Sequence, residues 1–309
     1  MKFDVVCFGA LNVDKLYKVN RIAKADEESV ILEAKESPGG SAANTAVGLA
    51  RLGVKTGYIG KVAEDREVKL HLSTFQTEGI DTNGIVKAKN GRSGTVIGFV
   101  DQDGERALYL DPGANNTLEF SEINLEYVAD AKFLHLTSFA GDKPFEAQKK
   151  LVEVVPDVKV TFDPGAIYAR KGMTSLKPLI NGCFAMFPNE NELRLLTGKD
   201  YREGAEALLS EGLSIVAVKL CERGCYVTDG KESHLIEPYK VEVADSTGAG
   251  DAFCAGFIYG LLKNRTLKEC GLIGNFVASR CLTKMGARDG LPYARDLPLQ
   301  NLSTPEWWL

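Results

Sequence analysis

The sequence predicts an α/β fold in which helices cover a mostly parallel β-sheet and a few extra strands form a small second layer. Short apolar strands alternate with helices over most of the second half of the 309-residue chain, as is typical of parallel sheets packed against helices. Two hairpin-like stretches, at about 16–34 and 95–110, do not fit this alternation. We expect them to pair into a small antiparallel layer over one edge of the main sheet. Two separate surface hairpins would give the same periodicity.

The first half of the chain begins with a buried strand, followed further on by a helix of small residues. The run at 3–9 is apolar, β-branched and bounded by glycine. Residues 41–51 place small and apolar side chains at helical spacing, and Gly53 supplies a stop signal. The other elements expected here are strands at 16–20, 28–34, 55–59, 95–100 and 106–110, a helix at 64–77 and a turn at Asp101-Gln102-Asp103-Gly104.

The second half predicts a regular alternation of strands and helices. The expected strands lie at 132–136, 158–162, 183–187, 214–219 and 225–228, and the expected helices at 144–154, 190–196, 202–210, 250–262 and 267–284. A chain of this length is compatible with one large α/β domain and a small appendage. We therefore expect a single domain over 1–309, with the extra strands inserted at about 12–36 and 92–112.

Composition and missing motifs exclude several classes of protein. A net charge of −5 and a pI of about 5.5 disfavour a nucleic-acid partner, which normally requires a basic patch. The sequence contains no run of ~18 apolar residues, so we expect no membrane-spanning helix. Acidic residues flank the short apolar run at the amino terminus, which argues against a signal peptide. Neither the G-x-S-x-G of serine hydrolases nor the Walker A loop occurs. The seven cysteines include no C-x-x-C pair, so we expect reduced cysteines in a cytoplasmic protein.

Glycine makes up 31 of 309 residues, above the typical usage of ~7%, and two clusters contain the informative ones. The first, PGGSAANTAVGLARLG at 38–53, places Gly39 and Gly40 before the helix of small residues. These glycines let the backbone approach a ligand, the first N–H groups of the helix can donate to it, and Asn44 can present its amide to hydroxyl groups. A tight turn before a helix packed on the sheet would use the same residues.

The second cluster, DSTGAGDAFCAGF at 245–257, leads from a strand into a helix. Successive backbone N–H groups at Gly248, Ala249 and Gly250 would form an anion site at the positive end of the helix dipole. Asp251 follows in the first helical turn. A carboxylate beside an anion is costly unless it has a function, such as taking the proton of a hydroxyl that attacks a phosphoryl group. The length of the pattern favours this interpretation over an ordinary acidic helix start.

A third segment, FPNENELRLLTG at 187–198, follows another strand. Asn189 and Glu192 stand three residues apart and share a face at a helix start, and their oxygens suit hydrated Mg²⁺. The same spacing is that of a capping box, which by itself is the simpler interpretation.

Together the three segments resemble the ribokinase (PfkB) family of carbohydrate kinases. The similarity runs from GALNVD at 9–14 to GARDGLP at 286–292 and so covers nearly the whole chain; DSTGAGDAF is its most specific motif. The resemblance implies a ribokinase-like three-layer α/β/α fold with a small β-sheet lid over the substrate. It also implies ATP-dependent, Mg²⁺-requiring phosphorylation of a hydroxyl group on a sugar or a nucleoside.

The same resemblance implies roles for individual residues. Asp251 is the expected catalytic base, with Gly248, Ala249 and Gly250 as the anion hole. The residues that match the substrate-binding set are Asn12, Asp14, Gly39, Gly40 and Asn44. Those that match the nucleotide site are Lys219, Gly224, Thr247 and Asn275. Asn189 and Glu192 would hold Mg²⁺ through water, and Asp245 with the GARDG stretch would form a K⁺ site.

Three hypotheses for the acceptor and the activity remain open. Ser41 and Ser138 stand where ribokinases carry a lysine and an acidic residue, which removes contacts expected for free ribose. A sugar kinase acting on a furanose or a related alcohol is the leading hypothesis, and a nucleoside kinase on the same scaffold is the alternative. A non-catalytic relative is disfavoured because Asp251 and the TGAG run are intact. An exposed lid could also pair with a second copy of the chain into a homodimer.

Overall fold

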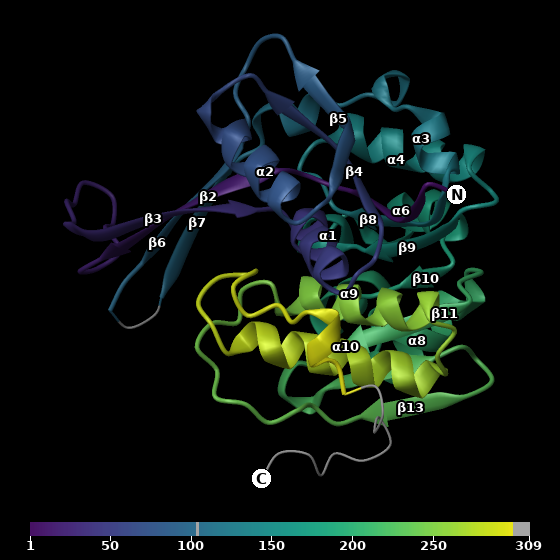
Figure 1. Cartoon of the computed structure of the whole chain (residues 1–309). Helices are drawn as coiled ribbons and strands as arrows, with labels where there is room; N and C mark the ends of the chain where they lie inside the picture. The colour runs from purple at the N-terminus through teal and green to yellow at the C-terminus, as the bar shows by residue number, and fades with distance from the viewer. Residues whose placement is uncertain (103–104, 299–309) are drawn as a thin grey trace.

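Within residues 1–102 and 105–298, which this computed structural model describes, nine strands form the main sheet in the order β13-β12-β11-β10-β9-β8-β1-β4-β5 (Figure 1). Neighbouring strands from β5 to β11 pair in parallel, and β12 and β13 add an antiparallel edge. The expected mostly parallel sheet is confirmed. The strands are β1 Phe3–Phe8, β4 Thr56–Ala63, β5 Asp81–Ala88, β8 Ala131–Thr137, β9 Lys159–Asp163, β10 Ala185–Met186, β11 Ile215–Lys219, β12 Cys225–Thr228 and β13 Ser233–Ile236.

Helices cover both faces of this sheet and complete three layers. In β1, Val5 and Cys7 belong to one hydrophobic core, while Val6 and Phe8 belong to the core on the opposite face. This alternation follows from the two-residue repeat of a strand. The first face carries α1 Ser41–Arg51, α2 Arg66–Thr77, α9 Ala249–Leu262 and α10 Leu267–Leu282. The second carries α3 Leu125–Ala129, α4 Asp142–Val154, α5 Gly165–Ala169, α6 Gly172–Asn181, α7 Glu190–Thr197 and α8 Tyr201–Ser210.

A second, four-stranded sheet, which we call the lid, projects from one side of the body (Figure 1). Its order is β3-β2-β6-β7, with β2 Asn12–Val19, β3 Ile31–Gly39, β6 Gly94–Val100 and β7 Arg106–Asp111. The two hairpins are antiparallel as expected, but β2 and β6 join them in parallel. The interpretation as two separate hairpins is therefore wrong. Of the expected turn at 101–104, Asp103 and Gly104 lie outside the described residues.

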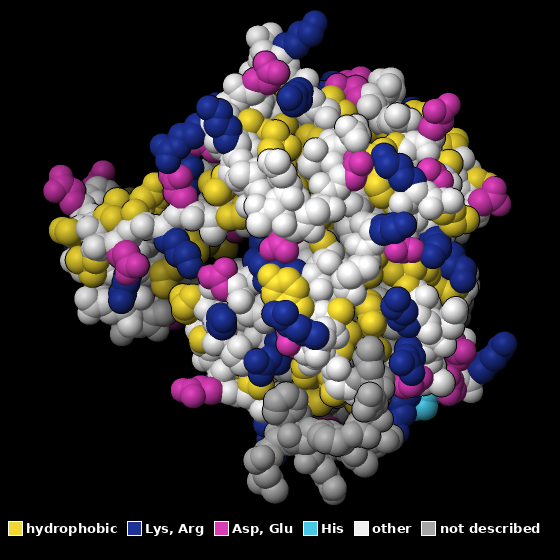
Figure 2. Space-filling view, viewed as in Figure 1, with side chains coloured by type: hydrophobic (Ala, Val, Ile, Leu, Met, Phe, Trp, Pro, Cys, Tyr) yellow, Lys and Arg dark blue, Asp and Glu magenta, His cyan; other side chains and the backbone are white. Residues whose placement is uncertain are grey.

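Apolar side chains on the lid are exposed on both of its hairpins. A Cβ placed on Gly98 of β6 would lie 2.5 Å from Leu16 and 2.8 Å from Leu108, so these two leucines meet over the glycine. Hydrophobic side chains are visible along the lid at the left of Figure 2. Ile31, Leu32, Leu108, Tyr109 and Leu110 are between 42% and 63% exposed. Pairing of two lids into a homodimer stays a prediction.

Several helices and strands have sequences that do not predict them, for physical reasons. β5 and β13 are edge strands with polar sequences, and Gly84 interrupts the pattern of β5. α6 contains Pro178, a residue that ordinarily breaks helices. α3 and α5 have five residues each and lack a periodic pattern.

All seven cysteines are free, and only Cys221 is exposed. Among the described residues, the helices are too short or too polar to cross a bilayer.

Candidate active site

The predicted site residues gather at the edge of the main sheet where the parallel strands end. Asn12 follows β1, Asn189 follows β10, and Lys219 is the last residue of β11. The amino ends of α1 and α9, which follow the two glycine clusters, lie at the same edge. Ligands of open α/β sheets bind in this position.

The first glycine cluster brings the backbone against the side chain of Asp14. Gly40 has a φ of 100°, and a Cβ there would lie 2.2 Å from the carbonyl oxygen of Ala10. A Cβ on Gly39 would lie 2.3 Å from Oδ2 of Asp14. A larger side chain would therefore collide at both positions. Gly40 also requires glycine because of its left-handed conformation. The result is a carboxylate held beside the start of α1.

Small residues let α1 and α9 approach until the two glycine clusters meet. A Cβ on Gly48 of α1 would lie 2.8 Å from Cβ of Ala255 in α9. At this short separation, Nδ2 of Asn44 donates to Oδ2 of Asp251 at 2.8 Å, and the hydroxyl of Thr45 donates to the backbone oxygen of Asp251 at 3.2 Å. A predicted substrate residue and the predicted base are thus in direct contact, although 207 positions separate them.

The second cluster turns tightly into α9. Gly248 caps the helix with a φ of 78°, and a Cβ there would lie 2.5 Å from Cβ of Ala287. The N–H of Ala249 donates to the backbone oxygen of Ser246 at 3.4 Å, so this donor is partly engaged. The next N–H groups of the first turn, beginning with that of Gly250, have no acceptor four residues back within the helix. They form the positive end of α9, and Asp251 stands beside them.

Charged and ionisable groups from several elements surround Asp251. Burial raises its pKa to about 7; the Asn44 hydrogen bond opposes this rise, the Asp163 charge adds to it, and Lys219 and Arg288 oppose it. Burial also raises the pKa of Asp14 to about 6, against the charge of Arg288. Both carboxylates are thus poised to change protonation near neutral pH.

An ion pair that the sequence did not suggest lies beneath residues 245–250, which we call the anion loop. Nζ of Lys219 donates to Oδ2 of Asp163 at 2.5 Å, and the two side chains are only 14% and 9% exposed. Burial opposes the charge of Lys219, but Asp163 holds the pKa of Lys219 above its ordinary value. A Cβ on Gly250 would lie 3.4 Å from this Nζ. The side chain of Lys219 therefore faces the interior below Gly250.

The other predicted nucleotide residues shape two nearby segments. Nδ2 of Asn275 donates to the backbone oxygens of Ile236 and Glu237 at 3.1 and 3.0 Å. Gly224, with a φ of 80°, packs under the same segment, because a Cβ there would lie 2.0 Å from the oxygen of Ile236. These two residues thus fix the backbone at 236–237, and their place in a nucleotide site stays a prediction.

Asp245 ties the anion loop to the GARDG turn. Its Oδ1 accepts from the N–H and the hydroxyl of Thr247 at 2.9 and 2.7 Å, and its Oδ2 accepts from the N–H of Gly286 at 2.8 Å. The structure thus shows bracing contacts for Asp245 and Thr247. The K⁺ site stays a prediction.

Asn189 and Glu192 form the capping box that their spacing predicts. The N–H of Glu192 donates to Oδ1 of Asn189, and the N–H of Asn189 donates to Oε2 of Glu192, both at 2.8 Å. Burial and then the charge of Asp163 raise the pKa of Glu192, and Lys219 lowers it. Among the described residues no three acidic, cysteine or histidine side chains are grouped to hold a metal directly. Amide and carboxylate oxygens are of the kind that suits hydrated Mg²⁺, and the Mg²⁺ site stays a prediction.

Two further residues of the site were not indicated by any sequence motif. Asn115 donates from Nδ2 to Oδ1 of Asn12 at 3.0 Å and to the backbone oxygen of Leu11 at 2.9 Å, and so fixes the side chain of Asn12. Arg288 reaches the first glycine cluster from the GARDG turn. The GARDG sequence predicts a cation loop and carries no signal that its arginine is buried.

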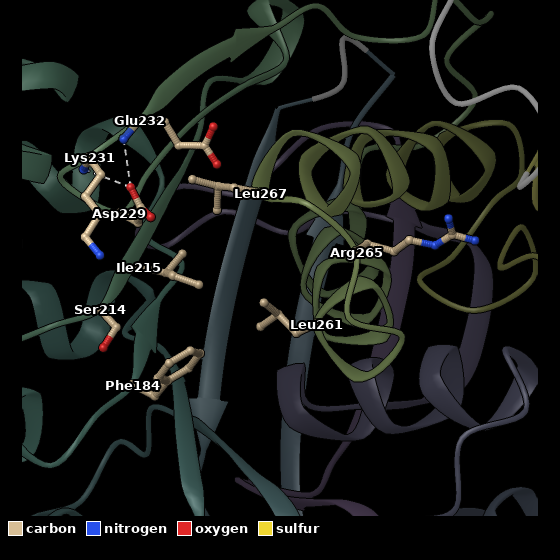
Figure 3. A pocket seen from close by; sticks show the side chains of 9 residues that line it. All are labelled: Phe184, Ser214, Ile215, Asp229, Lys231, Glu232, Leu261, Arg265 and Leu267. Atoms are coloured by element: carbon tan, nitrogen blue, oxygen red, sulfur yellow. Dashed lines mark hydrogen bonds between the residues drawn. The ribbon is translucent and has the colours of Figure 1, made fainter.

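The cavity in Figure 3 is not this site. It has a volume of about 470 Å³, and Phe184 and Ser214 lie where β10 and β11 begin, at the opposite edge of the sheet. Asp229 accepts there from the backbone N–H groups of Lys231 and Glu232, both at 2.9 Å. Its carboxylate therefore closes a turn and has no link to the glycine clusters.

Known proteins resemble this chain over most of its length. The profile of the pfkB family carbohydrate kinases matches residues 2–294. An uncharacterized sugar kinase from Archaeoglobus fulgidus is 43% identical over 81% of this chain and 100% of its own length. An ATP-dependent ribose-1-phosphate kinase from Halopiger xanaduensis is 32% identical over 89% of this chain and 92% of its own. Among solved structures, a ribokinase from Thermotoga maritima superposes with a TM-score of 0.85 at 25% identity, covering 95% of this chain and 97% of that chain.

Proposed function

Since this chain belongs to the pfkB family of carbohydrate kinases and has a ribokinase-like fold, we propose that it transfers the γ-phosphoryl group of ATP to a hydroxyl group of a small sugar, with Asp251 as the general base. The observation that carries this proposal is the hydrogen bond between Asn44 and Asp251. This contact joins the first glycine cluster, at the start of α1, to the start of α9, and it supports a role for Asp251 between an acceptor and the phosphoryl group. A hydroxyl held there lies beside both its proton acceptor and the electrophile.

The chemistry of transfer follows from these positions. Asp14 accepts hydrogen bonds from acceptor hydroxyls, which suits a carboxylate beside a glycine backbone. Asp251 takes the proton of the attacking hydroxyl as the new P–O bond forms. The N–H groups at the start of α9 stabilise the charge on the transferred group, and the Lys219 ammonium lies just beneath them. Mg²⁺, which Asn189 and Glu192 would hold through water, would neutralise phosphate charge.

A panel of acceptors tests the proposed function. Purified protein with ATP and Mg²⁺ is offered pentoses, hexoses, sugar phosphates such as ribose 1-phosphate, and nucleosides, and ADP release is measured. We expect transfer to at least one sugar or sugar phosphate. Failure of every acceptor in the panel to release ADP above background would contradict the proposal.

One observation favours a nucleoside as the second candidate acceptor. Asp14 and Leu16 lie on the same face of β2, and Leu16 meets Leu108 over Gly98. The lid therefore offers an apolar surface next to the sugar-binding carboxylate, against which a base can pack. A nucleoside that is phosphorylated with a higher kcat/KM than its free sugar would establish this alternative.

The pH dependence of turnover follows from the raised pKa of Asp251. The carboxylate accepts a proton only when it is deprotonated, so kcat is expected to fall as the pH drops through about 7. The measurement is kcat at saturating ATP and acceptor between pH 5.5 and 9. A rate that stays constant down to pH 5.5 would exclude Asp251 as a base with this pKa.

Gly39→Ala is expected to weaken acceptor binding selectively. The new methyl group would collide with Oδ2 of Asp14 and displace the carboxylate. We expect the KM for the acceptor to rise about tenfold, equivalent to about 1.4 kcal/mol, with the KM for ATP as the internal control. An unchanged acceptor KM would show that Asp14 does not bind the acceptor.

Activation by K⁺ is proposed for the loop braced by Asp245. The carboxylate connects Thr247 of the anion loop with Gly286, so a cation bound beside it would order the start of α9. We expect a higher kcat in K⁺ than in Na⁺ at the same ionic strength. Equal rates in the two salts would refute the K⁺ site.

A further inference from the structure

Arg288 is a buried cation in the middle of the proposed acceptor site. It is 7% exposed, and it forms no salt bridge with any residue in the described part of the chain. Its Nε donates to Oδ1 of Asn44 at 2.8 Å, and its Nη2 donates to the backbone oxygen of Gly39 at 3.3 Å. Burial lowers its pKa to about 10, and the nearby Tyr58, Asp14 and Asp251 oppose this shift. The guanidinium is therefore charged at neutral pH, and a buried charge is costly unless it has a role.

Arg288 determines how Asn44 is oriented. A guanidinium only donates hydrogen bonds, so the amide oxygen of Asn44 must face it. The amide nitrogen is then turned towards Asp251, to which it donates at 2.8 Å. The chain of contacts from Arg288 through Asn44 to Asp251 links the GARDG turn, α1 and α9 in one network.

A second buried side chain, close enough to Arg288 to be affected by its charge, contacts Asn12. His71 approaches the backbone oxygen of Asn12 with Nε2 at 2.9 Å; because a carbonyl only accepts, Nε2 bears the hydrogen. Burial and the charge of Arg288 lower the pKa of His71 to about 3, so the ring is neutral and Nδ1 is an acceptor. Nδ1 of His71 and Nη1 of Arg288 are both buried without a hydrogen-bond partner among the described residues. One is an acceptor and the other a donor, so the two are chemically complementary.

We propose that Arg288 is the positioning residue of the acceptor site: its planar fork holds Asn44 and the Gly39 backbone in place, and its charge stabilises the Asp14 and Asp251 carboxylates on either side of the acceptor. This inference rests on the proposed function. A neutral amide has neither the charge nor the two nitrogens of the fork, and lysine could supply the charge but not the fork. The two roles are therefore separable by substitution.

The first variant, Arg288→Gln, removes both roles. The groups that face Asp251 are Asn44, Tyr58, Asp163, Lys219 and Cys281 from other elements and Cys254 from α9 itself, and all of them are retained. Loss of a nearby positive charge raises the pKa of a carboxylate, so the acidic limb of the kcat profile is expected to move up by about one pH unit. The acceptor KM is expected to rise at least about tenfold, equivalent to about 1.4 kcal/mol, with the KM for ATP unchanged.

The second variant, Arg288→Lys, retains the charge and loses the fork. We expect the acidic limb to return to within a few tenths of a unit of the unmodified protein, while the acceptor KM stays elevated. If Arg288 served only for packing, Arg288→Gln would not shift the acidic limb, and Arg288→Lys would have no shift to reverse.

Arg51→Gln is the matched control. Nη1 of Arg51 donates to the backbone oxygen of Arg288 at 2.6 Å and to that of Leu291 at 3.3 Å, so it holds the same turn from outside the site. Loosening the turn in this way should leave the acidic limb in place. Urea unfolding of each variant shows whether it folds.

The outcomes separate the two proposals. If the unmodified protein transfers phosphate to no acceptor, the proposed function fails, and the role of Arg288 fails with it. If transfer is normal but Arg288→Gln leaves the limb and the acceptor KM unchanged, only the role of Arg288 is overturned. The same conclusion follows if Arg51→Gln moves the limb as far as Arg288→Gln does.

Discussion

Replacing Asp251 with asparagine is expected to lower kcat at least about 100-fold while leaving the dissociation constant of ATP within about twofold. Asparagine has the same shape, and its amide oxygen can still accept the hydrogen bond from Nδ2 of Asn44. The variant therefore keeps the contact between α1 and α9 but loses the carboxylate that takes the proton. Rates at saturating substrates and calorimetric titration with ATP measure the two quantities.

Asp157→Asn is the matched control for this substitution. It makes the same chemical change at an exposed aspartate just before β9, at the opposite edge of the sheet from the proposed site. We expect its kcat to equal that of the unmodified protein. A near-normal kcat for Asp251→Asn would remove Asp251 from the mechanism, whereas a similar loss in Asp157→Asn would point to a general effect of altered charge.

Replacing Asp163 with alanine is expected to destabilise the protein by about 3–5 kcal/mol at neutral pH, since it leaves a buried ammonium without its partner. The Lys219 and Asp163 side chains are largely buried and joined at 2.5 Å. An unpaired, buried Lys219 would have a lowered pKa, so the destabilisation should shrink as rising pH removes its charge. Urea unfolding at pH 7 and pH 9 measures both effects.

Two further variants make this test specific. Asp142→Ala removes the partner of Lys171 in a pair where Asp142 is 84% exposed, and it should cost less than about 1 kcal/mol. The double variant Asp163→Ala with Lys219→Met removes both charges and should recover much of the stability, but not the activity. If Asp163→Ala alone lies within about 1 kcal/mol of the unmodified protein, the pair is not a structural requirement.

Strong local signals predicted many of the elements. The helix at 41–51 and the strand at 225–228 have the bounds that the sequence indicates. In both cases the pattern of apolar and small residues agrees with the neighbouring stop signals. The missed elements lack this agreement: α6 includes Pro178, and β5 includes Gly84 at the edge of the sheet. Their conformations depend on packing against neighbours distant in sequence.

The amino-acid sequence by itself indicated the fold class, the family resemblance and the two glycine clusters, because each is read from short local patterns and from their order along the chain. Only the tertiary structure decided which of these residues meet. Asn44 contacts Asp251 across 207 positions, and Arg288 contacts Asn44 across 244. The Lys219–Asp163 pair likewise joins the ends of two strands 56 positions apart. Contacts between residues so distant in sequence depend on the strand order and on the close packing of α1 on α9, which no local pattern encodes.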